Sequence, residues 1–156
     1  MSIKEAMSRF TTGVTVVTTH YEGQDWGMTC NSFNTVSLEP AMVLWSIRKE
    51  ANSHEAFTQS GSYVVNVLQA DQKDTAMRFA SGPQAQRFAE QASERTAKNN
   101  VKLNGSVAWF ECRLAQVVTA GDHDILIGEV VGYGSQDGEG LAYANRQFGV
   151  LSAFEN

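Results

Sequence analysis

The chain has 156 residues, 42% hydrophobic and 19% charged, which predicts one folded, soluble domain over residues 1–156 and excludes a disordered chain. Seventeen acidic against twelve basic residues give a net charge of −5 without any lysine- or arginine-rich run, so we expect no nucleic-acid partner. No stretch approaches the roughly 20 apolar residues that span a membrane, and neither a signal-peptide pattern nor a paired-cysteine spacing is present, so we expect a cytoplasmic protein without a membrane partner.

The first third of the chain predicts a short helix followed by strands. Apolar residues recur at helical spacing over residues 3–10, and their stripe must pack against something. The β-branched run 13–19 predicts a strand that forms a hairpin with a second strand over 26–33. The continuous apolar run 41–47 predicts a buried strand.

The middle of the chain predicts two helices around one strand. Asn52 and Glu55 are spaced as a capping box for a helix over 53–59. Residues 63–68 predict another strand, and Asp71 is expected to cap the helix that follows it.

The last third predicts a long hairpin. The polar segment 84–100 is expected to hold a short helix anchored by Phe88, followed by a solvated loop. Residues 106–119 and 125–133 predict two strands joined by a tight turn, and 134–140 predicts a flexible loop.

Strands therefore outnumber helices, and most of them are hairpin neighbours. This pattern favours a mainly β fold, an antiparallel sheet closed into a small barrel with peripheral helices. A doubly wound fold is disfavoured because the glycine cluster over 132–140 lacks the Gly-x-Gly-x-x-Gly spacing and the helix that should follow it. A nicotinamide cofactor would therefore bind without a Rossmann site.

Three motifs carry chemical information, each with an ordinary structural alternative. Residues 27–40 form a strand edge that continues into small hydroxyl and amide side chains, which can hydrogen-bond a planar heterocycle or simply make a polar turn. Arg48 and Lys49 precede a capped helix and can clamp a phosphate, or form a solvated basic turn. Gly121-Asp122-His123 places a histidine between two strands, where it can serve a site or only close the hairpin.

Other kinds of site have little support in the sequence. The three histidines, His20, His54 and His123, are dispersed without the spacing of metal ligands, so we expect no metal site. A hydrolase is not indicated either, because no Gly-x-Ser-x-Gly elbow or phosphate-binding glycine loop is present.

Taken together with Ser53, residues 65–68 and residues 128–130, these motifs resemble the short-chain flavin reductases. These are the small reductase components that supply reduced flavin to two-component monooxygenases. The resemblance runs from about residue 10 to residue 148, with the motifs in the order of the family. It implies a split β-barrel of the FMN-binding type, a homodimer, that oxidises NADH or NADPH and reduces FMN or FAD.

The resemblance also implies roles for individual residues. Those that match the flavin-ring contacts of the family are Thr29, Cys30, Asn31 and Ser32, with Phe79 and Ala80 as a further flavin-side contact. Those that match the ribityl and phosphate contacts are Ser46, Ile47, Arg48, Lys49 and Ser53. Those that match the nicotinamide site are His123, Tyr143 and Arg146, with His123 as the candidate catalytic residue.

The leading hypothesis is an NAD(P)H:flavin oxidoreductase that passes reduced flavin to a flavin-dependent monooxygenase. The alternative is a carrier or sensor on the same barrel that holds FMN but has no nicotinamide site. Relatives often carry alanine at the position of Cys30, a smaller residue at Trp45 and a second aromatic hydroxyl at Phe148. These departures leave the choice between FMN and FAD, and between NADH and NADPH, open.

Overall fold

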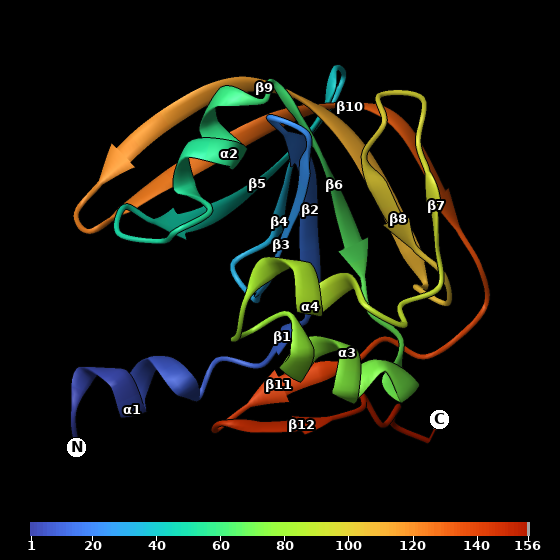
Figure 1. The fold of residues 1–156 in the computed structure, drawn as a ribbon. Coiled ribbons are helices and arrows are strands. Elements are labelled where there is room, and N and C mark those ends of the chain that lie inside the picture. The colour runs from blue at the N-terminus through green and yellow to red at the C-terminus, as the bar shows by residue number, and fades with distance from the viewer. Residues whose placement is uncertain (156) are drawn as a thin grey trace.

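A computed structural model describes residues 1–155 (Figure 1). Its body is a curved seven-stranded antiparallel sheet in the order β3-β2-β6-β9-β10-β5-β4. These strands are β2 (Thr15–Tyr21), β3 (Gln24–Cys30), β4 (Asn34–Leu38), β5 (Ala41–Arg48), β6 (Ser62–Val67), β9 (Ala108–Ala120) and β10 (His123–Ser135). The two edge strands, β3 and β4, are consecutive in the chain but do not pair, so the barrel is open between them. This confirms the mainly β fold and the split barrel that the resemblance implied, whereas the closed sheet that the strand pattern favoured is wrong, because the two edge strands do not pair.

Strand β5 differs from its prediction as a fully buried strand. Val43, Trp45 and Ile47 are buried, whereas Met42 and Leu44 between them are only half-buried. Successive side chains of a strand point to opposite faces, and only one face of this strand lies against the core. Hydrophobicity alone therefore overestimated the burial of the alternate positions.

Two apolar clusters lie on opposite faces of β2. On one face, Val17 packs with Trp45, which meets the ring of Phe57 edge to face at 4.9 Å. On the other face, Val16 belongs to a cluster that includes the buried side chain of Phe79. Both faces of β2 are therefore covered, one by the barrel interior and the other by the helices that follow β6.

The helices lie around this sheet (Figure 1). Within residues 1–155 they are α1 (Ile3–Ser8), α2 (His54–Gln59), the 3₁₀ turn η1 (Ala70–Gln72), α3 (Lys73–Arg78) and α4 (Gln84–Phe88). Helix α1 extends away from the sheet, so the apolar stripe that we expected to be packed is exposed in the single chain. None of these helices is long and apolar enough to cross a membrane.

Both predicted helix caps are wrong. Residue Ser53, not Asn52, is the N-cap of α2, and no side chain caps this helix. The backbone N–H groups of Ala51 and His54 donate to Arg48 and Ala51, and these two tight turns place Asn52 before the start of the helix. Asp71 lies inside the 3₁₀ turn, which is closed instead by a capping box in which the side chains of Gln69 and Gln72 each accept a hydrogen bond from the backbone N–H of the other residue.

The polar segment 84–100 was predicted correctly in its first half only. Phe88 of α4 packs edge to face on Phe79 with 5.0 Å between the ring centres, as expected for an anchor. The expected solvated loop instead contains β7 (Ser93–Arg95), which pairs with β8 (Val101–Leu103). This hairpin is fastened to the barrel where Arg95 donates two hydrogen bonds to Asp25.

A second small sheet brings the two ends of the described chain together. It consists of β1 (Thr12–Gly13), β11 (Ala142–Ala144) and β12 (Gln147–Gly149), in the order β1-β11-β12. Thr12 pairs with Tyr143, so the C-terminal hairpin lies beside the segment that enters β2. The hairpin therefore reaches the same side of the barrel as β3 and α3 (Figure 1).

Candidate functional site

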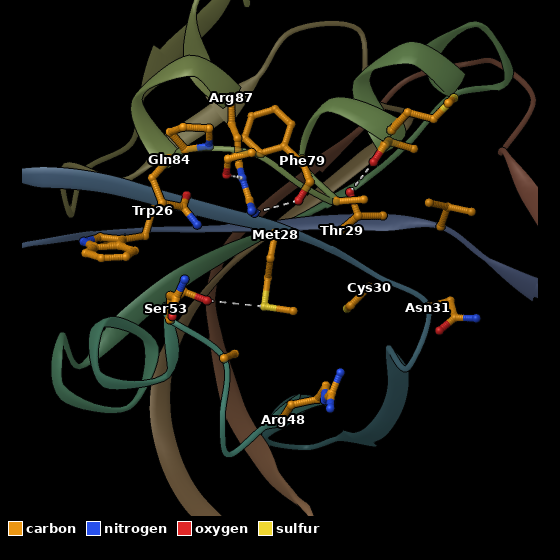
Figure 2. A pocket seen from close by; sticks show the side chains of 18 of the residues that line it. Trp26, Met28, Thr29, Cys30, Asn31, Arg48, Ser53, Phe79, Gln84 and Arg87 are labelled. Atoms are coloured by element: carbon orange, nitrogen blue, oxygen red, sulfur yellow. Dashed lines mark hydrogen bonds between the residues drawn. The ribbon is translucent and has the colours of Figure 1, made fainter.

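A cavity of about 810 Å³ lies along β3, between the loop that follows β5 and the α3–α4 region (Figure 2). Its volume is in the range of sites that hold cofactors. The residues that line it are Val14, Gln24, Trp26, Met28, Thr29, Cys30, Asn31, Arg48, Ala51, Asn52, Ser53, Ala76, Met77, Phe79, Ala80, Gly82, Pro83, Gln84, Arg87, Tyr143, Arg146 and Phe148.

The charge of this cavity is opposite to that of the whole protein. Among the described residues that line it, three are arginines, Arg48, Arg87 and Arg146, and none is acidic. The net charge of the chain is −5. Because low-dielectric walls concentrate the field of a local charge cluster, this cavity favours an anionic ligand although the whole molecule does not.

Three of the residues predicted to contact the flavin ring line the cavity, Thr29 and Cys30 at the end of β3 and Asn31 directly after it. The Thr29 hydroxyl donates to the carbonyl oxygen of Ala76, and its backbone N–H donates to Phe79, so Thr29 also joins β3 to α3. The Cys30 Sγ lies 3.1 Å from the hydroxyl oxygen of Thr15. Burial raises the pKa of the Cys30 thiol, so this side chain is a neutral thiol at neutral pH.

Only part of the predicted phosphate-binding group reaches the cavity. Arg48 and Ser53 line it, and the Ser53 hydroxyl points to the Met28 sulfur at 3.7 Å (Figure 2). Ile47 is fully buried in the barrel core, because it alternates with Arg48 along β5. Lys49 does not line the cavity, and its ammonium group donates to the carbonyl oxygen of Gly121 at 2.8 Å.

Two predicted serines bind each other instead of lining the cavity. The hydroxyl oxygen of Ser32 accepts a 2.9 Å hydrogen bond from the backbone N–H of Ser46. This bond joins the loop after β3 to β5, next to the point where β4 begins to pair with β5. Neither Ser32 nor Ser46 lines the cavity.

The structure places His123 beside the site but not in it. His123 is the first residue of β10 and pairs in register with Arg48, yet it does not line the cavity of the single chain. Its Nδ1 lies 2.8 Å from a carboxylate oxygen of Asp122. The hydrogen bond with His123 holds the pKa of Asp122 below its usual value of 3.8.

The C-terminal hairpin supplies the remaining predicted residues. Tyr143 and Arg146 line the cavity together with Phe148, whose ring centre lies 5.0 Å from that of Tyr143. Arg146 occupies the two-residue turn between β11 and β12 with a positive φ of 62°, which side chains other than glycine rarely adopt. The third wall of the cavity thus comes from a part of the chain for which the sequence had predicted no element.

Several lining residues were missed by the sequence analysis. Trp26 and Met28 precede Cys30 at the two-residue period of a strand, and this period was a signal that could have identified them. Arg87 gave no such signal, because its partners are carbonyl oxygens from distant segments. It donates to Gly27 and Phe79 at 2.8 Å each, and burial lowers its pKa.

The barrel is open and mainly β, and a cofactor-sized cavity lined by arginines lies along its edge strand. These features identify a split barrel that binds a small molecule. The chain belongs to the family described as the flavin reductase like domain, whose model matches residues 7–152.

Curated relatives support this assignment. The chain is 40% identical over 151 residues to the FMN reductase (NADH) SmoA of Agrobacterium fabrum, with 97% of this chain and 86% of that protein covered. It is 42% identical over 142 residues to the reductase component of the flavin-dependent trigonelline monooxygenase of Acinetobacter baylyi. That match covers 90% of this chain but only 46% of the relative, so the chain spans less than half of this longer protein.

Solved structures show the same fold. The NADH:FAD oxidoreductase of Streptomyces globisporus C-1027 superposes with a TM-score of 0.92 at 32% identity, covering 97% of this chain and 92% of that one. A second structure of that enzyme, with a TM-score of 0.91 over 96% of this chain and 91% of that one, is a complex with NAD and FAD fragments.

Proposed function

We propose that the protein is an NAD(P)H:flavin oxidoreductase that reduces FMN or FAD and releases the reduced flavin to a partner monooxygenase. The observation that carries this proposal is the cofactor-sized cavity beside β3, lined by three arginines and no described acidic residue in a chain of net charge −5. The names of the relatives, an FMN reductase (NADH) and the reductase component of a monooxygenase, support it.

The residues present fit a flavin. The side chains of Trp26, Met28 and Phe79 offer apolar surface to a planar ring, while Arg48 offers a charge-assisted hydrogen bond to a phosphate. Asn31 and Ser53 add polar groups at the ends of this wall. The donor set therefore suits a ligand that combines a flat heterocycle with a negative charge.

The flavin and the dihydronicotinamide, when bound, supply the redox chemistry themselves by transfer of a hydride. The task of the chain is to bind and orient the two ligands and to exclude water. The positive charge of Arg48 and Arg146 also favours the greater negative charge of a reduced flavin. No general acid is required, so we assign His123 to orientation of the nicotinamide.

We include a homodimer in this proposal. Ile3 and Met7 of α1 and Phe10, which follows the helix, are 70%, 69% and 78% exposed, and such an apolar group is unusual on a surface unless a second chain covers it. His123 also lies outside the cavity of its own chain, and a second copy offers a way to complete the site. We expect this dimer to be cytoplasmic and leave NADPH as an alternative to NADH.

The test is nicotinamide oxidation by the purified protein, followed by absorbance with NADH or NADPH and with or without added FMN or FAD. Flavin-dependent turnover above the rate of protein-free mixtures supports the reductase and ranks the cofactors. Bound flavin without turnover would instead support a carrier.

The carrier or sensor is the second candidate, because His123 does not line the cavity. The variants His123→Ala and Arg146→Ala separate the two functions. In a reductase they raise the KM for the nicotinamide far more than the KM for flavin. In a carrier, His123→Ala, a change outside the cavity, leaves flavin binding, the only function, unchanged.

A further inference from the structure

The loop 48–53 supplies one wall of the cavity through Arg48, Ala51, Asn52 and Ser53. Two contacts of Lys49 fasten this loop to the turn between β9 and β10. Its backbone N–H donates to the carbonyl oxygen of Asp122 at 3.0 Å, and its ammonium group donates to that of Gly121 at 2.8 Å. Lys49 therefore joins the loop to a turn more than 70 residues away in the chain.

A chain of side-chain hydrogen bonds makes a third connection at the end of the same loop. His54 Nε2 lies 2.7 Å from Asp124 Oδ2, and the Thr119 hydroxyl lies 2.8 Å from Asp124 Oδ1. The hydrogen bond from His54 and then that from Thr119 hold the pKa of Asp124 below 3.8. The carboxylate is thus ionised and only accepts, so His54 donates to it.

The location of Asp124 lets it affect the cavity only indirectly, through its hydrogen bond with His54. Its side chain is only 10% exposed, and that of His54 is 27% exposed. Neither lines the cavity, so neither contacts a bound ligand there. Asp124 lies on β10 directly after His123, and its neighbour across the sheet is Ile47, the residue before Arg48.

We propose that Asp124 is a positioning residue for the flavin site. Through His54 it holds the loop 48–53 against the β9–β10 turn, so that Arg48 is in place before a flavin binds. The inference rests on the proposed function, because it assumes that the cavity takes a flavin.

The consequence concerns binding more than turnover. When one conformation of a loop is competent to bind, the apparent dissociation constant rises by the inverse of the fraction of molecules in that conformation. Loss of the Asp124–His54 hydrogen bond lets the loop 48–53 leave its position in the free protein. Saturating flavin returns the loop to this position when it binds, so the maximal rate changes little.

The experiment measures FMN binding by quenching of FMN fluorescence, without nicotinamide, together with steady-state kinetics. We expect Asp124→Ala to raise the Kd for FMN about tenfold, with kcat at saturating FMN within about twofold of wild type. His54→Ala should have the same effect, and the double variant should be no worse than either single one. His54→Gln, which retains an N–H donor, should restore most of the affinity.

The control variant is His20→Ala. His20 contacts Asp25 at 2.8 Å, a histidine–aspartate pair of similar geometry and exposure that does not line the cavity, and Arg95 still binds Asp25 when His20 is removed. This variant should bind FMN as wild type does. If Asp124→Ala does not fold, the partly exposed His54→Ala provides the same test.

The outcomes separate this inference from the proposed function. If the wild-type protein binds no FMN, both are overturned. If the wild type binds FMN and the Asp124 and His54 variants bind it equally tightly, only the positioning role is overturned. An equal loss in His20→Ala, or a fall in kcat without a change in Kd, also contradicts it.

Discussion

Arg48 and Lys49 are neighbours in the sequence, yet their side chains have different surroundings. Arg48 lines the cavity, whereas the Lys49 ammonium group binds the carbonyl oxygen of Gly121. We therefore predict that Arg48→Ala raises the KM for FMN about tenfold and leaves the KM for riboflavin nearly unchanged, because riboflavin lacks the phosphate that the guanidinium would bind. Steady-state kinetics at saturating NADH, with each flavin varied in turn, measure this difference.

Lys49→Met provides the comparison. If Lys49 acts only by positioning Arg48, its loss raises the KM for FMN more than that for riboflavin, and adding Lys49→Met to Arg48→Ala raises the KM for FMN no further. A further rise in the double variant would instead return Lys49 to the phosphate-binding role that the sequence predicted. An equal loss of both flavins in Arg48→Ala would contradict the phosphate contact of Arg48.

Arg146 lies in a strained part of the backbone. Its φ of 62° follows that of Asn145, 51°, in the turn between β11 and β12. A non-glycine residue there costs about 1–2 kcal/mol, part of which a glycine recovers. We predict that Arg146→Gly stabilises the protein by about 0.5–1 kcal/mol while raising the KM for the nicotinamide. Urea denaturation and steady-state kinetics check the two effects.

The matched variant is Arg146→Ala, which removes the guanidinium but keeps a side chain at positive φ. It should raise the KM as Arg146→Gly does, without the gain in stability. If both variants are as stable as wild type, the turn is not strained. If neither changes the KM, Arg146 has no role in ligand binding.

At the scale of elements, the close packing of β3 under α3 and α4 shapes the cavity. A Cβ added at Gly27 would lie 2.7 Å from the ring of Phe79 and 3.0 Å from that of Phe88. We predict that Gly27→Ala lowers the free energy of unfolding by about 1–3 kcal/mol and weakens flavin binding, because Phe79 must shift and it lines the site. Thermal or urea unfolding and FMN titration provide the measurements.

Gly13→Ala is the control for this prediction. No atom lies within 4 Å of a Cβ built at Gly13, so the same substitution should change neither stability nor binding by much there. Wild-type stability and affinity in Gly27→Ala would show that the α3–α4 region moves freely and does not define the cavity wall.

Helix α1 carries the prediction for assembly. Because its apolar stripe has no partner within residues 1–155, we expect it to lie in the interface of the proposed homodimer. Met7→Glu should therefore lower the molar mass in solution from that of two chains to that of one, as measured by light scattering after size exclusion. Lys4→Glu, on the polar side of the same helix, should remain dimeric. A monomeric wild type would contradict the dimer.

At the scale of the whole molecule, the sequence predicted strands better than it predicted faces and contacts. The β-branched run after Gly13 and the two long apolar stretches around His123 are local signals, and β2, β9 and β10 form where they lie. Successive side chains of a strand point to opposite faces, so only every second one can reach a site on one face. For this reason Arg48 lines the cavity while its neighbour Ile47 is buried in the core.

Tertiary contacts account for what the sequence could not predict. Arg87 lines the cavity and binds carbonyl oxygens of β3 and of the α3–α4 loop, and no spacing in the sequence indicates such partners. Lys49 and Asp124 are similar, since their contacts depend on a loop and a turn that meet only after the sheet has formed. The positive charge of Lys49 suggested a phosphate contact, but in the fold its ammonium group binds the carbonyl oxygen of Gly121.

The same contacts predict how the stability of the protein depends on pH. The hydrogen bond from His54 holds the pKa of Asp124 below 3.8. Burial alone would raise the pKa of Asp25, but hydrogen bonds from Arg95 and His20 outweigh it and lower the pKa below 3.8. A carboxylate whose folded-state pKa is depressed contributes stability that is present above its unfolded pKa and is lost as the pH falls through its folded pKa.

We therefore expect the contribution of Asp25 and Asp124 to the free energy of unfolding to be constant at neutral pH and to fall once the pH drops below about 4. Urea unfolding midpoints measured from pH 7 to about pH 3 test this expectation, and Asp25→Asn and Asp124→Asn should each flatten the acid decline. Asp122→Asn is the control, because the Asp122 side chain is 89% exposed and water screens its contact with His123. If the Asp25 and Asp124 variants decline as steeply as wild type and Asp122→Asn, other groups cause the loss of stability in acid.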